Sequence, residues 1–127
     1  MRSLEELNYL PISTSQGDLK NRITIVFDLL VNNVEGTNAE FAEAFVDVIV
    51  YQSYAGAIPL DCEKDILNWI AKTYDEDDKA YIEAVASLYC MMSSERALKE
   101  LKQKLSLAKH RWVAEKFQEA LDEFVLV

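Results

Sequence analysis

Apolar residues recur along this chain at the three- and four-residue spacing that is typical of amphipathic helices. The apolar stripe before Lys109–Arg111 and the stripe after it are out of phase by about a third of a turn. One straight helix cannot bury both stripes, so we expect a break there. The pattern predicts helices over residues 3–10, 18–34, 38–54, 61–74 and 79–92, a sixth from Ser93 or Ser94 to that break, and a seventh over 111–125.

Local signals support several of these helix boundaries. Gly36 is expected to end the second helix, because glycine tolerates a positive φ. Ile23–Phe27 is also rich in β-branched residues, so a strand is the alternative there. We favour a helix because no other segment offers a convincing partner strand. The predicted N-terminal signals are the capping boxes Ser3–Glu6 and Thr37–Glu40 and the N-caps Asp18 and Asp61.

The chain has the size and composition of one all-α domain spanning residues 1–127. Its three glycines and two prolines are too few for the tight turns of a sandwich or barrel. The helix at 79–92 is apolar almost all round, which is typical of a central, buried helix. Phe41-Ala-Glu-Ala and Tyr81-Ile-Glu-Ala lie 40 residues apart. About six or seven helices therefore form either a bundle or three stacked helical hairpins, a short HEAT-like α-solenoid.

Charge is distributed unevenly along the chain, whose formal net charge is −9. The stretch from Asp28 to Glu83 has thirteen acidic and three basic side chains, whereas Glu95 to Lys116 has three acidic and seven basic ones. A compact domain with this order is expected to have a strongly negative surface beside a mildly basic one. Such a field favours the approach of a basic partner.

Secretion, membrane insertion and cysteine-based metal or redox chemistry find little support in the sequence. Glu5 and Glu6 lie where a signal peptide needs apolar residues, and the chain has no run of about 20 apolar residues to span a membrane. Cys62 and Cys90 have no metal-binding or redox spacing. We therefore expect a cytoplasmic protein with no cofactor and no membrane contact, and the sequence leaves its oligomeric state open.

Catalytic and metal-binding patterns are also missing. His110 is the only histidine, with no nucleophile or carboxylate in a familiar arrangement, and we interpret it as a surface or turn residue. An EF-hand loop starting at Asp75 would need other residues at Lys79 and Ala80. The sequence therefore predicts neither an enzyme nor a metal site.

A basic stripe at helical spacing is formed by Lys99, Lys102 and Lys109. Nucleic acid would be repelled by the net charge of the whole protein. We interpret the stripe as a solvated face and expect no direct nucleic-acid binding.

The best candidate for a binding site is one side of the helix at 38–54. Carboxylates and tyrosines there fall within about 60° of one another, opposite Phe45 and Ile49, and should face outward. Exposed acids steer a basic surface, and aromatic residues anchor it. The alternative is an ordinary acidic face with half-buried tyrosines. The candidate partner-binding residues are Glu40, Glu43, Asp47, Tyr51 and Tyr54, together with the loop residues Asp75, Glu76, Asp77 and Asp78.

The chain resembles the small, acidic, all-helical immunity proteins of bacterial toxin systems, including contact-dependent growth inhibition. The resemblance depends on its small size, the acidic side of the 38–54 helix, the acidic 75–78 loop and the lack of catalytic residues. The resemblance implies a stoichiometric inhibitor that binds a basic cognate toxin domain, often a nuclease, and blocks its active site. The alternative is a helical adaptor or chaperone that holds a partner peptide in an exposed apolar groove.

Overall fold

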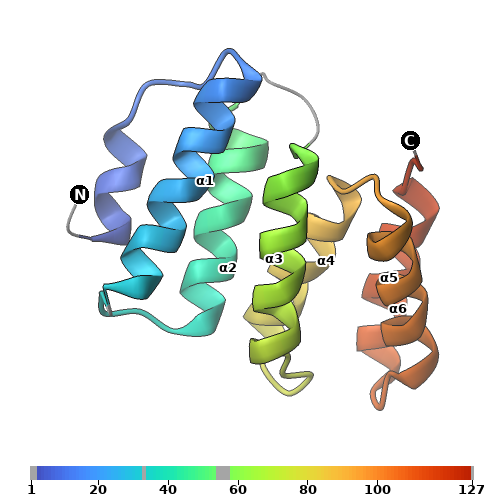
Figure 1. Ribbon diagram of the computed structural model, residues 1–127. Helices are drawn as coiled ribbons and strands as arrows, with labels where there is room; N and C mark the ends of the chain where they lie inside the picture. Colours follow the sequence, from blue (N-terminus) through green and yellow to red (C-terminus); the bar gives the residue numbers. More distant parts are fainter. Residues whose placement is uncertain (1–2, 33, 54–57, 127) are drawn as a thin grey trace.

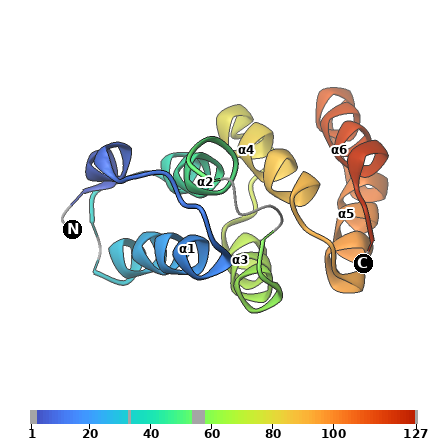
Figure 2. The same cartoon turned by 90° about the horizontal axis from the view of Figure 1, so that it is seen from above.

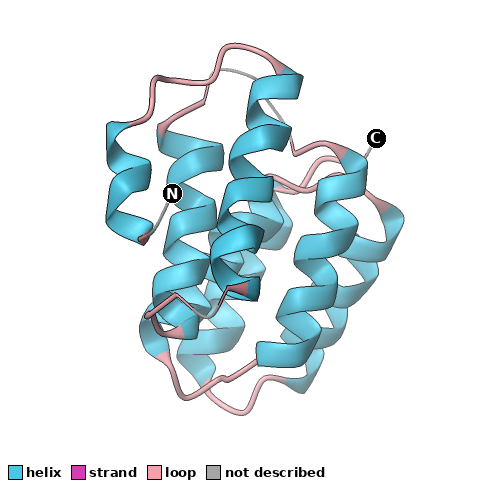
Figure 3. Cartoon of the chain, turned by 60° about the vertical axis from the view of Figure 1, so that its left-hand side comes forward, coloured by secondary structure: helices cyan, strands magenta, loops and turns pink. Residues whose placement is uncertain are grey.

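In the computed structural model, which describes residues 3–32, 34–53 and 58–126, the secondary structure is helical (Figures 1 and 3). An isolated backbone bridge joins Ser13 and Ser53, and the described residues form no strand. The π-helix η2 continues α2 without a break. The elements are η1 (Leu4–Tyr9, a 3₁₀ helix), α1 (Gln16–Val31), α2 (Asn38–Val46), η2 (Asp47–Tyr51), α3 (Leu60–Thr73), α4 (Lys79–Cys90), α5 (Glu95–Leu107) and α6 (Arg111–Glu123).

The helices form three hairpins that lie side by side, α1 with α2, α3 with α4 and α5 with α6 (Figures 1 and 2). Seen from above in Figure 2, α1, α3 and α5 form one layer, which we call the odd layer. Helices α2, α4 and α6 form the other, with η1 beside α2, and we call this the even layer. The all-α prediction is confirmed, and the arrangement is that of three stacked helical hairpins.

Helix α4 lies at the centre of the molecule, in close contact with α2 on one side and α6 on the other. Small buried residues, Ala84 and Ala86 on α4 and Ala42 on α2, allow these backbones to approach closely. Only Lys79 and a narrow stripe of Ala80, Glu83 and Ser87 on α4 are exposed. The prediction of a central, largely buried helix at 79–92 is therefore confirmed.

Helix α3 is held mainly through large side chains. Its backbone makes no close pairing with α1 or α5 among the described residues, in contrast to the even layer. A series of aromatic rings instead crosses the core from α1 to α4. Ring-centroid distances are 4.9 Å from Phe27 to Phe45, 5.4 Å from Phe45 to Trp69 and 6.2 Å from Trp69 to Tyr81. Aromatic side chains of this size fill the wider spacing around α3.

A buried carboxylate, Glu63 on α3, joins that helix to the start of α5. It is fully buried and accepts hydrogen bonds from the backbone N–H groups of Ser93, at 3.2 Å, and Ser94, at 3.0 Å. The Ser94 hydroxyl donates to it as well. The free N–H groups at a helix N-terminus favour a negative charge, so Glu63 is satisfied there.

Several boundaries follow local signals, as predicted. Thr37 and Glu40 form a capping box at the start of α2. The Ser94 hydroxyl caps α5. The break between α5 and α6 falls at residues 108–110, and Ile23–Phe27 is helical within α1.

Three predicted caps are wrong. Ser15, not Asp18, is the N-cap of α1, and its hydroxyl accepts from the Asp18 backbone N–H at 3.1 Å. Pro59, not Asp61, is the N-cap of α3. Asp61 lies in the first turn of that helix, where its carboxylate accepts from the Cys62 N–H at 3.0 Å and pairs with Lys20 on α1. Ser3 precedes η1 but makes no capping hydrogen bond through its side chain.

Gly36 has a different role from the predicted one, because its φ does not lie in the left-handed region. A Cβ atom there would approach Phe41 Cε2 at 3.0 Å and Leu4 Cδ1 at 3.2 Å. Glycine at this position lets the Leu4 side chain of η1 and the Phe41 side chain of α2 pack closely against the loop. No helix among the described residues combines the length and apolar character that membrane crossing needs.

Candidate partner-binding surface

The predicted acidic side of α2 and η2 faces outward, with Phe45 and Ile49 buried on the opposite side. Glu40 and Glu43 are exposed, Asp47 is half-buried, and Tyr51 is 73% exposed. The alternative of half-buried tyrosines therefore does not hold for Tyr51. Tyr54 lies outside the described residues.

Three adjoining grooves cross the even layer. The first, of about 370 Å³, lies between η1 and α2, and the second, of about 270 Å³, between α2 and α4. Both are lined by Glu43 and Asp47. The third, of about 370 Å³, lies between α4 and α6 and shares Glu83 and Ser87 with the second. The shared residues make the three grooves one continuous surface, which we call the acidic face.

The acidic face is lined by many carboxylates and one basic side chain. That base, Lys116, lies 3.8 Å from Glu119 in an ion pair. The elements of the even layer together carry ten acidic and three basic residues, a formal charge of −7. The groove-lining carboxylates are those of Glu5, Glu40, Glu43, Asp47, Glu83, Glu119 and Glu123.

Two of these carboxylates differ in how free they are to bind a partner. The Glu40 carboxylate accepts a hydrogen bond of 3.0 Å from the Thr37 backbone N–H, so part of its charge stabilises the start of α2. Asp47 lies between the first two grooves, and its partial burial raises the pKa of its carboxyl. Loss of solvation disfavours the ionised form. A cationic side chain entering either groove would offset that cost at Asp47.

The acidic loop at 75–78 does not line these grooves, and its residues have local structural roles. Asp75 accepts from the Asp77 backbone N–H, and Asp78 caps α4 by accepting from the Tyr81 N–H at 3.2 Å. Glu76 accepts from the Lys109 backbone N–H at 2.9 Å. The Asp77 carboxylate lies 3.0 Å from the His110 ring and remains 85% exposed. The loop therefore connects the second and third hairpins.

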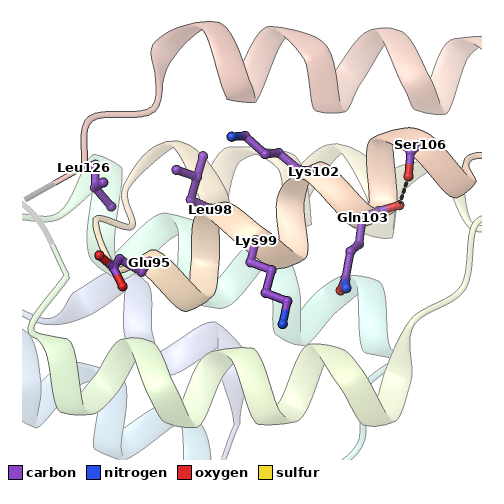
Figure 4. A pocket seen from close by; sticks show the side chains of 7 residues that line it. All are labelled: Glu95, Leu98, Lys99, Lys102, Gln103, Ser106 and Leu126. Atoms are coloured by element: carbon purple, nitrogen blue, oxygen red, sulfur yellow. Dashed lines mark hydrogen bonds between the residues drawn. The ribbon is translucent and has the colours of Figure 1, made fainter.

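Two members of the basic stripe, Lys99 and Lys102, lie on α5 in the odd layer and line a groove of about 680 Å³ together with Leu98 and Leu126. Figure 4 shows the Lys99 and Lys102 ammonium groups directed away from each other. Such an arrangement does not converge on one anion, which favours the interpretation as a solvated face.

Lys104, on the same helix, lies over the Tyr74 ring with Nζ 4.9 Å from its centroid, and burial lowers its pKa.

The two cysteine side chains are buried or half-buried. Burial raises the pKa of the Cys62 and Cys90 thiols to about 11, so both are protonated at neutral pH. Among the described residues, no group of three or more histidine, cysteine or carboxylate side chains is placed to hold a metal ion.

Comparison of the chain with protein-family models, with curated proteins and with solved structures finds no match.

Sequence reasoning identified the α2 part of the acidic face and missed the rest. Glu5, Glu83, Glu119 and Glu123 join it only because η1, α4 and α6 lie beside α2. One signal was available: the stacked-hairpin arrangement would place the second helices of successive pairs side by side. Combining that arrangement with the outward acidic positions would have pointed to Glu83.

Proposed function

We propose that this protein is a non-catalytic inhibitor, an immunity protein that neutralises a basic cognate toxin through its acidic face. The observation that carries the proposal is the continuity of the three grooves, lined by seven carboxylates and one already paired lysine. The acidic face presents a row of negative charges, as the phosphates of a nucleic acid do, and a basic protein could bind either. A toxin that holds nucleic acid with lysines and arginines fits this description.

Binding would combine steering with anchoring. Exposed carboxylates raise association rates with basic proteins, up to about 10⁸–10⁹ M⁻¹s⁻¹ at low salt. Lysine or arginine side chains of the partner would enter the grooves beside Glu43, Asp47 and Glu83. Tyr51, exposed at the end of the second groove, would supply the aromatic anchor that tight interfaces often contain.

The first experiment is to identify the partner from the neighbouring gene. A secreted protein with a variable, basic C-terminal domain would supply the candidate toxin. Co-expression of that domain with this chain is expected to restore growth.

The double variant Glu43→Lys, Asp47→Lys is expected to bind the toxin at least 100-fold more weakly, because two attractive charges become repulsive. The matched control, Asp28→Lys with Glu35→Lys, changes the net charge equally at two exposed positions outside the grooves. Binding is measured by calorimetry, and folding by circular dichroism. Equal affinities of the two folded double variants would overturn the proposed site.

A second candidate function, an adaptor or chaperone for an apolar peptide, is favoured by one observation. A groove of about 490 Å³ between α1 and α3 is lined by Phe27, Leu30, Val31 and Trp69. Peptide binding there would depend weakly on salt, whereas binding at the acidic face would weaken strongly as salt rises.

A further inference from the structure

The groove between α1 and α3 differs from those of the acidic face, because its lining is mainly apolar. Phe27 and Trp69 are half-buried in it, and Val31 is 77% exposed. Its lining residues all lie on α1 and α3, and in Figure 2 no described element lies on the outer side of these two helices. This mainly apolar lining, on a protein whose other layer is strongly acidic, makes the groove the best place on the described surface for an apolar contact.

The register of the two helices is set by the ion pair between Lys20 and Asp61, which are 41 residues apart. Both helices run in the same direction in Figure 1. The same offset places Thr24 opposite Asp65 at one end of the groove. It places Val31 opposite Lys72 at the other end, about 10 Å further along. The groove therefore has an apolar middle, a carboxylate at one end and an ammonium group at the other.

We propose that this groove is the interface of a two-fold dimer of the chain. A groove with opposite charges at its ends is complementary to its own copy turned end to end. In that antiparallel arrangement, Asp65 of each copy lies on Lys72 of the second copy, and the apolar side chains meet in the middle. A parallel arrangement would bring Asp65 against Asp65 and is excluded by repulsion.

The overall charge supports the same face. Two copies of a protein with a net charge of −9 repel each other, and an even layer of −7 cannot approach a second even layer. The elements of the odd layer carry seven acidic and eight basic residues, so this layer is nearly neutral. A dimer formed through it leaves both acidic faces outward, and the inference stands whether or not the acidic face binds a toxin.

The size of the interface predicts a weak dimer. Helices α1 and α3 are roughly 24 Å and 21 Å long and each about 10 Å wide, so together they present at most roughly 450 Å² per copy. A standard stable interface needs about 800 Å² per partner. We therefore expect reversible dissociation at micromolar to tens of micromolar concentrations.

Sedimentation equilibrium over roughly 1 µM to 1 mM tests the dimer. The wild-type mass is expected to rise from 14.5 kDa to about twice that value. Val31→Asp adds a carboxylate at an exposed position at the Lys72 end of the groove, which faces Asp65 of the second copy in the antiparallel arrangement. It is expected to keep the chain monomeric, with an unchanged thermal midpoint. A wild type that stays monomeric at 1 mM would overturn the proposal, as would a dimer that Val31→Asp leaves intact.

A charge exchange tests the antiparallel geometry. Asp65→Lys and Lys72→Asp are each expected to weaken dimerisation at least ten-fold, and the double variant to restore it. Lys99→Asp, on α5 outside the groove, is the matched control and should leave the dissociation constant within two-fold. Failure of the double variant to recover would rule out the proposed pairing.

Discussion

The even and odd layers of this protein contain the same number of long helices but differ in packing and charge. In the even layer, buried alanines let α4 approach α2 and α6, and the outward stripes carry carboxylates. In the odd layer, α3 stands away from its neighbours, large aromatic side chains fill the space, and the charges nearly cancel. Close packing thus accompanies the surface proposed to bind a basic partner, and looser packing accompanies the apolar groove.

The largest expected effect tests how the odd layer is held. Glu63→Ala leaves two backbone N–H groups and the Ser94 hydroxyl without their acceptor in a buried site. The free energy of unfolding is expected to fall by about 3 kcal/mol. The thermal midpoint should fall by roughly 10 °C for a chain of this length.

The matched control is Asp28→Ala on α1, an exposed carboxylate outside the grooves. It should change the unfolding free energy by less than about 0.5 kcal/mol. Similar midpoints for the two variants would show that Glu63 does not join α3 to α5.

A smaller effect tests the close packing of the even layer. Ala84 is buried on the side of α4 that faces α2, so Ala84→Leu should force the two helices apart. Overpacking of this kind costs about 1–3 kcal/mol. Ala71→Leu, the same change at an exposed position on α3 in the odd layer, should alter stability by less than about 0.5 kcal/mol. Urea unfolding measures the free energy of unfolding of both variants. Equal decreases in the two variants would contradict the difference in packing between the layers.

The smallest effect concerns Asp47 on the acidic face. Burial raises its folded-state pKa above the ordinary value of 3.8, so the folded protein holds this proton more tightly than the unfolded chain. The resulting stability is present at low pH and is lost as pH rises from about 3.8 through the folded pKa.

Asp47→Asn removes this ionisation, so the variant should gain a slightly higher thermal midpoint than the wild type from about pH 5 to 7, with the difference vanishing near pH 3. The same variant should bind the toxin more weakly. A lower midpoint than the wild type at pH 7 would contradict a destabilising charge at Asp47.

The elements that sequence could predict depend on nearby residues. The capping box of Thr37 and Glu40 is contained within four residues. The shift between the two apolar stripes around residues 109–111 can be seen within two helical turns on each side. Ile23–Phe27 is helical because Leu19, Ile23 and Val26 together form a buried helical stripe. That stripe outweighs the local β preference of its branched residues.

The features that could not be predicted depend on distant partners. Asp61 lies inside the first turn of α3 and pairs with Lys20 on α1, a contact that the local sequence does not show. In the sequence, Glu63 cannot be distinguished from an exposed helical glutamate. Its role depends on the start of α5, where the Ser94 backbone N–H donates to its carboxylate. The contact of Glu76 in the 75–78 loop with the turn before α6 also depends on a distant segment, whereas partner binding by this loop stays a prediction. The acidic residues of α2 and η2 lie on one continuous helical segment, so their common side was predictable from the sequence. The full acidic face also depends on how η1, α4 and α6 pack beside α2.

The central claim is that charge on the even layer governs partner binding. The most direct measurement is the association rate of the cognate basic domain at salt concentrations from about 10 to 500 mM. For the wild type and for the Asp28→Lys, Glu35→Lys control, we expect the rate to fall at least ten-fold as salt rises. For Glu43→Lys, Asp47→Lys, we expect a slow rate with little salt dependence. A wild-type rate and affinity that do not change with salt would contradict the account and favour the apolar groove.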